Sequence, residues 1–232
     1  MPRTLPSPVA LYAIGDVHGC AKTLDALLAR LDLTPADRVV FMGDYIDRGP
    51  DSRGVIDRLL DMEEAAWLGT GPVCTFLRGN HDQMMVDYLT GTGDYDLWRA
   101  NGGVFTLESY AAVGDVRIPS SHASFLSQTT IFYETPDFAF VHAGLDPLLS
   151  VEDNLRRADP DIFLWTRDHL DADLSLWEKP VVCGHTPVAE PIDRPTLIGI
   201  DTGAVFVGRL GLGRLTAVRL PERAFVSVPY CE

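Results

Sequence analysis

Three short apolar runs in the first third of the chain each end in a polar loop that contains glycine. The runs have the length of buried strands and cover residues 9–14, 39–42 and 73–77. Apolar residues at helical spacing follow each loop, within residues 21–31, 55–60 and 84–89. This order of strand, loop and helix predicts a largely parallel sheet covered by helices. Because ligands bind at the carboxyl ends of parallel strands, we expect a functional site among the polar loops.

The second half of the chain has a different pattern. Residues 91–127 are mixed in character and are expected to be helical, and the charged stretch 146–179 suggests short helices. Strand-like runs dominate the rest and cover residues 130–133, 138–141, 181–183, 197–200, 205–207, 215–220 and 224–228. They predict a second, mixed sheet. Since no internal repeat or obvious linker occurs, we expect residues 1–232 to form a single domain.

The charge balance argues against two classes of partner. The chain has 19 Lys and Arg against 33 Asp and Glu, a formal net charge of −14. It therefore lacks the broad basic face that binds nucleic acid or an anionic membrane. The global charge does not exclude a phosphorylated substrate, because bound cations and local arginines can make a site positive on an acidic protein.

The cysteines and the N-terminal region indicate a cytoplasmic protein. Cys20, Cys74, Cys183 and Cys231 are scattered without a C-x-x-C pair, which is typical of reduced thiols. The first apolar run ends at Asp16 and is too short for the hydrophobic region of a signal peptide. No stretch approaches the roughly 20 apolar residues that span a bilayer.

The loops after the apolar runs carry residue types that bind divalent metals. They hold two carboxylates, one amide oxygen and up to four imidazoles, namely Asp16, Asp44, Asn80, His18, His81, His142 and His185. Mixed oxygen and imidazole ligation suits manganese, iron or zinc better than calcium or a thiolate-bound zinc. Two carboxylates can neutralise more than one cation, so the set favours two metal ions over one.

Each motif also has a plain structural explanation. An Asp-Gly or Asn-His pair after a strand is usually only a turn, and Asp82 after His81 suits the first turn of a helix. His122 and His169 lack the glycine and strand context, so we interpret both as surface or packing residues. The number and order of the loops nevertheless favour a metal site, because chance seldom places five of them after strands in one chain.

Other catalytic chemistries lack their motifs. A cysteine phosphatase needs arginine six residues after its cysteine, and Ala26, Asn80 and Ala189 stand at those positions. The chain has no G-x-S-x-G motif of a serine hydrolase. The glycines at 208, 211 and 213 have the wrong spacing for a dinucleotide-binding loop.

The chain resembles the phosphoprotein phosphatase branch of the calcineurin-like metallophosphoesterases. Its matches to the three-part signature of that family are Gly15-Asp16-Val17-His18-Gly19, Gly43-Asp44-Tyr45-Ile46-Asp47-Arg48-Gly49 and Gly79-Asn80-His81-Asp82. Two later histidine motifs match His142-Ala143-Gly144 and Gly184-His185-Thr186. The likeness spans about residues 12–208 and is greatest to the group that includes the protein phosphatases of bacteriophage lambda and of bacteria. It implies an α/β (α+β) fold with two mixed sheets in a sandwich flanked by helices.

The resemblance also implies roles for single residues. Asp16, His18 and Asp44 would hold one metal ion, and Asp44 would bridge to a second ion held by Asn80, His142 and His185. His81 would be the general acid, oriented and charged by Asp47. The arginines that would grip the phosphate are Arg48, Arg78 and Arg167. The implied cofactors are two divalent ions, with Mn²⁺ favoured and iron or zinc as alternatives.

The implied reaction is hydrolysis of a phosphate monoester by direct attack of a hydroxide held by the two metals. The expected substrates are phosphoserine and phosphothreonine in a protein or peptide, with phosphotyrosine and small phosphate esters as further substrates. One alternative is a symmetrical diadenosine tetraphosphate hydrolase, against which the acid at Asp47 argues. Another is a non-catalytic phosphate-binding module, which the complete set of ligands argues against.

Overall fold

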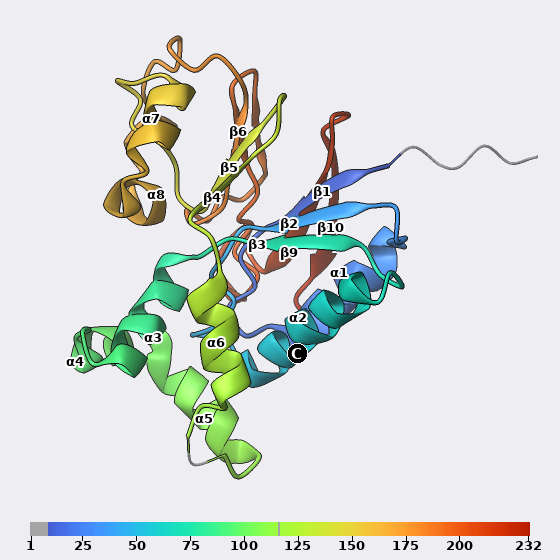
Figure 1. Cartoon of the computed structure of the whole chain (residues 1–232), viewed down its shortest axis with the longest axis vertical. Helices are drawn as coiled ribbons and strands as arrows, with labels where there is room; N and C mark the ends of the chain where they lie inside the picture. Colours follow the sequence, from blue (N-terminus) through green and yellow to red (C-terminus); the bar gives the residue numbers. More distant parts are fainter. Residues whose placement is uncertain (1–8, 116) are drawn as a thin grey trace, which may run out of the picture.

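Two five-stranded sheets lie face to face in the computed structural model, which describes residues 9–115 and 117–232 (Figure 1). The first sheet has the order β10-β9-β1-β2-β3, with β1 (Leu11–Ile14), β2 (Arg38–Phe41), β3 (Val73–Phe76), β9 (Arg214–Leu220) and β10 (Ala224–Pro229). β1, β2 and β3 are parallel, and β9 runs antiparallel to β1 with Ala13 opposite Val218.

The second sheet has the order β4-β5-β6-β8-β7. Its strands are β4 (Phe132–Glu134), β5 (Ala139–Val141), β6 (Val181–Cys183), β7 (Ile192–Arg194) and β8 (Leu197–Gly199). Here β5, β6 and β8 are parallel, while β4 and β7 are antiparallel edge strands. A single bridge between Leu77 and Thr130 leads from β3 towards β4.

Helices cover the outer faces of both sheets. On the first sheet these are α1 (Ala21–Leu31) and α2 (Ser52–Trp67), and on the second they are α7 (Val151–Arg157) and α8 (Pro160–Trp165) (Figure 1). A further group of helices lies beside the sandwich: α3 (Asn80–Thr90), α4 (Tyr95–Trp98), the π-helical turn η1 (Arg99–Gly103), α5 (Val104–Ala112) and α6 (Ser120–Gln128). A short 3₁₀ turn, η2 (Asp168–Leu170), follows α8.

Three apolar layers hold these elements together. The leucines of α1 pack on the first sheet, as their helical spacing predicts, and bury Leu24 and Leu27 against Phe41. A middle layer joins the two sheets through residues such as Val40 and Phe140. The outer layer of the second sheet buries Phe163 of α8, and together the layers form a helix–sheet–sheet–helix sandwich.

The two-sheet fold and the mixed sheets are confirmed. The runs at 215–220 and 224–228 are strands as predicted, but they form β9 and β10 of the first sheet instead of joining the second, because β9 pairs with β1. Two further details of the strand pattern were wrong. Residues 205–207 form turns instead of a strand, because they lie in a loop whose glycines 203, 208, 211 and 213 take positive φ angles. Ile192–Arg194 forms an edge strand that was not predicted, because two of its three residues are charged. Within the described residues, no helix combines the length and the apolar composition that a membrane span requires.

Candidate dinuclear metal site

The six predicted metal ligands converge at the carboxyl ends of five strands. Asp16 and His18 follow β1, Asp44 follows β2, and the other three lie after β3, β5 and β6. All six side chains are buried, with at most 7% of any residue exposed: Asp16, His18, Asp44, Asn80, His142 and His185. The parallel strands of both sheets therefore bring together residues that lie up to 169 positions apart in the chain.

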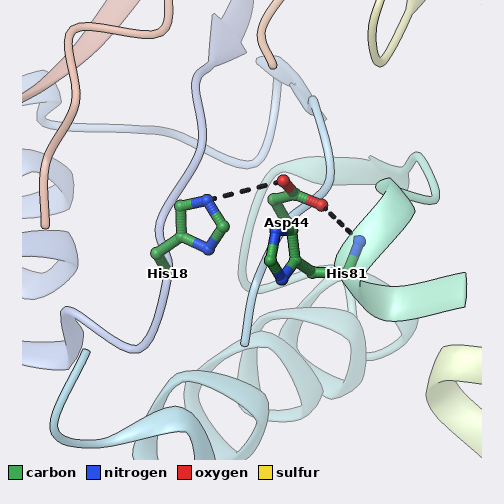
Figure 2. Close-up of side chains that lie close together, drawn as sticks. All are labelled: His18, Asp44 and His81. Carbon is green, nitrogen blue, oxygen red and sulfur yellow. Dashed lines mark hydrogen bonds and ion pairs between the residues drawn. The ribbon is translucent and has the colours of Figure 1, made fainter. Parts of the chain in front are cut away.

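Asp44 lies at the centre of the cluster. Its Oδ2 is 3.5 Å from Nε2 of His18 and 3.5 Å from Nε2 of His142, so the carboxylate faces both halves of the site. Its Oδ1 accepts a hydrogen bond of 2.9 Å from the backbone N–H of His81 (Figure 2). Asp44 belongs to two separate groups of donor atoms, one with His18 and His81 and one with His142 and His185, which is the position that a bridging ligand would need.

Backbone carbonyls set the tautomers of two histidines. Nδ1 of His18 lies 2.9 Å from the carbonyl of Ile46, and Nδ1 of His142 lies 2.8 Å from that of Met42. A carbonyl can only accept, so each Nδ1 carries the proton and each Nε2 presents a lone pair to the cluster. Metal-ligating histidines are oriented in the same way by a partner on their other nitrogen.

One further contact places an acceptor opposite an acceptor. Oδ1 of Asn80 lies 3.0 Å from Nε2 of His142, which carries a lone pair, and it also lies 3.0 Å from Nδ1 of His185. Asp16 accepts a hydrogen bond from the backbone N–H of His185 through Oδ2, while its buried Oδ1 has no partner. Buried acceptors that face one another, and an orphaned carboxylate oxygen, fit residues that would bind divalent cations.

The electrostatics of the cluster fit the same role. Burial lowers the pKa of His18 to about 3 and that of His185 to about 2, and it also lowers the pKa of His142. These imidazoles are therefore neutral near pH 7, the form that binds a metal. Burial raises the pKa of Asp16, and the carboxylates of Asp201 and Asp44 raise it further, so a cation there would relieve carboxylate repulsion. Burial also raises the pKa of Asp44, but the surrounding histidines outweigh it and shift that pKa downward.

Backbone strain is concentrated in the site. Among the described residues, eight that are not glycine have positive φ angles, and five of these are predicted site residues: His18 (46°), Asp44 (51°), Asp47 (71°), Arg48 (68°) and His185 (65°). Each such conformation costs on the order of 1–3 kcal/mol and persists only where the surrounding structure enforces it. These conformations thus lower the stability of the fold, but they direct the five side chains to one place.

His81 and Asp47 form a buried pair beside Asp44. Nδ1 of His81 lies 2.7 Å from Oδ2 of Asp47. The indole N–H of Trp98 donates to the same carboxylate at 3.0 Å, and the hydroxyl of Thr106 donates to its Oδ1 at 2.7 Å. Since Nδ1 is committed to Asp47, Nε2 of His81 is the nitrogen left for proton transfer.

The three predicted arginines have different settings. Nη1 of Arg48 lies 2.7 Å from Nε2 of His18, directly beside the cluster. Arg167 lies exposed in the loop after α8, close enough for its charge to lower the pKa of His142 and of His185. Arg78 instead donates to protein acceptors: Thr129 Oγ1, Gln83 Oε1 and the carbonyls of Leu126, Ser127 and Thr129. It anchors the end of α6, and a phosphate would have to replace some of these bonds.

Several supporting residues were not predicted to act in the site. Asp82 accepts hydrogen bonds from the backbone N–H groups of Asp44 (2.8 Å), Tyr45 (3.0 Å) and Gly79 (2.9 Å), so it ties the Asp44 loop to the start of α3. Burial, reinforced by the charge of Asp44, raises the pKa of Asp82 to about 7. Trp98 is fully buried and donates its indole N–H to Asp47. No local sequence signal indicates this role.

The two histidines outside the motifs are packing residues, as predicted. His122 is buried, with Nδ1 2.9 Å from the hydroxyl of Tyr110 and Nε2 3.1 Å from Asp57. His169 is fully buried and stacks on Trp177 at a centroid distance of 5.9 Å.

The geometry agrees with a comparison against known families. A sequence model described as "Calcineurin-like phosphoesterase" matches residues 10–199, most of the chain. The chain belongs to this family. Calcineurin-like phosphoesterases are dimetal-dependent hydrolases, which agrees with the two groups of candidate ligands that share Asp44.

Relatives within the family are named as two kinds of enzyme, a protein phosphatase and a dinucleoside tetraphosphatase. Serine/threonine-protein phosphatase 1 of Salmonella typhimurium is 31% identical over 218 residues, which cover 88% of this chain and 91% of that protein. Bis(5'-nucleosyl)-tetraphosphatase PrpE of Oceanobacillus iheyensis, named as the asymmetrical enzyme, is 28% identical over 93% of this chain and 90% of that protein. The nucleotide relative thus differs from the symmetrical hydrolase that we expected as the alternative.

Solved structures share the fold of this chain. A candidate diadenosine tetraphosphatase superposes with a TM-score of 0.67 and 25% identity, covering 99% of this chain and 97% of its own. A cold-active protein-tyrosine phosphatase from a Shewanella species superposes with a TM-score of 0.61 and 20% identity, covering 99% of this chain and 80% of its own, and shares the fold. The chain is therefore a phosphoesterase of this family, and the comparisons leave two classes of substrate.

Proposed function

We propose that this calcineurin-like phosphoesterase hydrolyses phosphoserine and phosphothreonine in proteins or peptides, with phosphotyrosine and small phosphate esters as further substrates. The observation that carries the proposal is the buried His81–Asp47 pair beside Asp44. A serine or threonine alkoxide is a poor leaving group, so its departure needs a proton donor. A dinucleoside polyphosphate loses a phosphate anion instead, which leaves without one.

The metal ions would be held by two overlapping sets of residues. Asp16, His18 and Asp44 would bind the first, and Asp44 would share the second with Asn80, His142 and His185. When bound, two divalent cations supply Lewis-acid activation of water and of the phosphoryl group. We propose Mn²⁺, with iron or zinc as alternatives, because the donor set mixes carboxylate, amide and imidazole.

The arginines would hold the phosphate. Arg48 reaches the cluster through its contact with His18, and the charge of Arg167 acts on His142 and His185 by lowering the pKa of each. Guanidinium groups match the oxygens of a phosphate and stabilise its charge as the bond to the leaving oxygen breaks. Arg78 is proposed as a third contact, since it directly precedes Gly79 and Asn80.

His81 would complete the reaction at the leaving oxygen. A hydroxide derived from water would bond to phosphorus as the bond from phosphorus to the leaving oxygen breaks, and the Nε2 proton of His81 would pass to the alkoxide. The products are an alcohol and inorganic phosphate. Asp47 holds Nδ1–H and stabilises the imidazolium before the transfer, while Trp98 and Thr106 hold the carboxylate in place.

A second candidate is asymmetrical hydrolysis of dinucleoside tetraphosphates. It is favoured by the PrpE relatives, which cover 93% of this chain. The buried acid pair disfavours it, since a phosphate leaving group does not require the proton that His81 would supply.

A paired turnover assay separates the two functions. Metal-stripped protein is reloaded with Mn²⁺ and given either a phosphoserine peptide or diadenosine tetraphosphate. We expect the higher kcat/KM with the peptide. A kcat/KM that is about a hundredfold or more higher for the dinucleotide would overturn the proposed function.

The proposal also covers the domain organisation, the group of relatives and the location of the protein. We propose that the chain acts as a single catalytic domain, because ligands come from both sheets, and that it belongs to the phage and bacterial group of protein phosphatases. The expected location is the cytoplasm, with no nucleic-acid or membrane partner, given the net charge of −14.

A further inference from the structure

Phe206 packs against the arginine that reaches the metal cluster. Cζ of Arg48 lies 5.4 Å from the centroid of the Phe206 ring, within the range of a cation–π interaction. The guanidinium of Arg209 lies 4.5 Å from the same centroid. The phenyl ring is thus within cation–π range of both the cluster arginine and a second arginine of its own loop.

Arg48 has little else to orient it. Its backbone N–H donates to the carbonyl of Gly102 at 3.3 Å, and its Nη1 lies 2.7 Å from Nε2 of His18. Among residues 9–115 and 117–232, no carboxylate lies within 4.0 Å of the Arg48 guanidinium to form an ion pair. A carboxylate partner would compete with phosphate for the N–H donors, whereas an aromatic face orients the group and leaves free those donors that do not contact His18.

The loop that carries Phe206 is built to hold the ring at this place. The backbone N–H groups of Phe206 (2.8 Å) and Gly213 (3.0 Å) both donate to the carbonyl of Gly203, which closes the loop at its base. Gly203 has a φ of 66°, and a Cβ there would meet the Phe206 ring at 3.2 Å. A Cβ at Gly102 would lie 2.8 Å from Cγ of Arg48. Both glycines therefore leave room for the contact between the arginine and the ring.

We propose that Phe206 is a positioning residue that orients Arg48 for the phosphate group of the substrate. This inference rests on the proposed function, in which Arg48 binds phosphate. Loss of the ring leaves the charge of Arg48 in place but frees its side chain. We expect KM for a phosphoserine peptide to rise about three- to tenfold, the range of a partly exposed cation–π contact, while kcat changes little.

The experiment uses Mn²⁺-loaded protein and five variants. Phe206→Leu removes the ring, and Phe206→Tyr keeps it as the conservative rescue. Phe105→Leu is the matched control, because Phe105 borders the same surface pocket as Arg48 and Phe206 but makes no recorded cation–π contact with Arg48. Arg48→Ala and the double variant Arg48→Ala/Phe206→Leu test whether the ring acts through the arginine. The readouts are KM, kcat, inhibition by inorganic phosphate, bound manganese and Tm.

The expected result is a pattern across all variants. Phe206→Leu raises KM and weakens inhibition by inorganic phosphate by the same factor, while Phe206→Tyr and Phe105→Leu behave as the parent protein. In the Arg48→Ala background, Phe206→Leu has no further effect, because the group that it orients is absent.

Other results would overturn the inference in distinguishable ways. If Arg48→Ala impairs phosphate binding but Phe206→Leu does not, the positioning role fails and the proposed function stands. If Arg48→Ala leaves KM and phosphate inhibition unchanged, the proposed role of Arg48 fails as well. If the two substitutions have additive effects, or if Phe206→Leu lowers Tm and bound manganese together, the ring is only structural.

Discussion

The carboxylate of Asp47 lies 2.7 Å from Nδ1 of His81, and both side chains are buried. Two further donors hold the carboxylate of Asp47, namely the indole N–H of Trp98 and the hydroxyl of Thr106. The backbone N–H of Asp47 in turn donates to Ser52 Oγ at 3.1 Å and to Thr106 Oγ1 at 2.9 Å. The fixed carboxylate keeps a proton on Nδ1 of His81 and leaves Nε2 available for proton transfer. The first two predictions test it.

Replacing His81 with asparagine should affect substrates according to their leaving groups. We expect kcat for an alkyl phosphate or a phosphoserine peptide to fall by about 10²–10⁴-fold, the usual contribution of a general acid. Para-nitrophenyl phosphate should lose much less, because its leaving group needs little protonation. Steady-state kinetics on both substrates provide the measurement. Equal losses on the two substrates would count against His81 as the acid.

Trp98→Phe tests whether the indole N–H of Trp98 holds Asp47 in place, and it leaves His81 and Asp47 themselves unchanged. The substitution keeps an aromatic side chain in the core but removes the N–H that donates to Asp47 at 3.0 Å. A hydrogen bond to a buried charge contributes about 1.5–3 kcal/mol, so we expect urea denaturation to show a loss of that size in unfolding free energy. Turnover of alkyl phosphates should fall several-fold, with para-nitrophenyl phosphate nearly unaffected. Unchanged stability would show that the indole N–H does not hold Asp47.

Asp44→Asn should disrupt both metal positions at once. Asp44 lies 3.5 Å from the lone pairs of His18 and of His142, so its loss removes a ligand from each half of the cluster. Isothermal titration with Mn²⁺ should show two bound ions for the parent protein and much weaker binding at both positions for the variant. Asn80→Ala is the control and should weaken one position only. Retention of one tight ion in Asp44→Asn would contradict the bridging role.

His169 should make stability depend on pH. Burial lowers its pKa from 6.5 to about 4, so between these values the unfolded chain binds more protons than the folded one. The unfolding free energy should therefore fall as the pH drops from about 6.5 to about 4, by about 3 kcal/mol from this residue alone. His169→Phe keeps a ring against Trp177. It should make the unfolding free energy depend less steeply on pH, by the contribution of about one proton. Urea denaturation of the metal-free proteins at several pH values measures the difference, and identical slopes would contradict it.

Much of the fold followed from short-range patterns. The leucines of α1 at helical spacing and the apolar strands β1, β2 and β3 were predicted with nearly correct ends, because burial of one helix face or of a whole strand leaves a local trace. The strand β9 was also predicted, as residues 215–220, but its antiparallel pairing with β1 left no such trace. β9 lies more than 200 residues further along the chain, and its pairing depends on long-range hydrogen bonds that no local pattern encodes.

The candidate site divides in the same way. The motifs identified every candidate ligand that the structure gathers around Asp44, because glycine-flanked polar residues after apolar runs are visible one loop at a time. The supporting contacts were not visible: Trp98 and Asp47 are 51 residues apart, and nothing near either one predicts that the indole N–H meets the carboxylate. Arg78 and Arg48 are likewise both arginines in motifs, yet one binds carbonyls of its own fold and the other a phenyl ring.

The sequence by itself thus determined the family, the donor atoms and the order of the strands that carry them, since these depend on residue type and local spacing. Only the tertiary structure decided which histidine nitrogen faces the cluster and which arginine keeps its donors free. It also decided which aromatic residue supports the acid and which one supports the arginine. Those choices depend on distances between segments remote in the chain, and packing of the two sheets and their helices sets those distances.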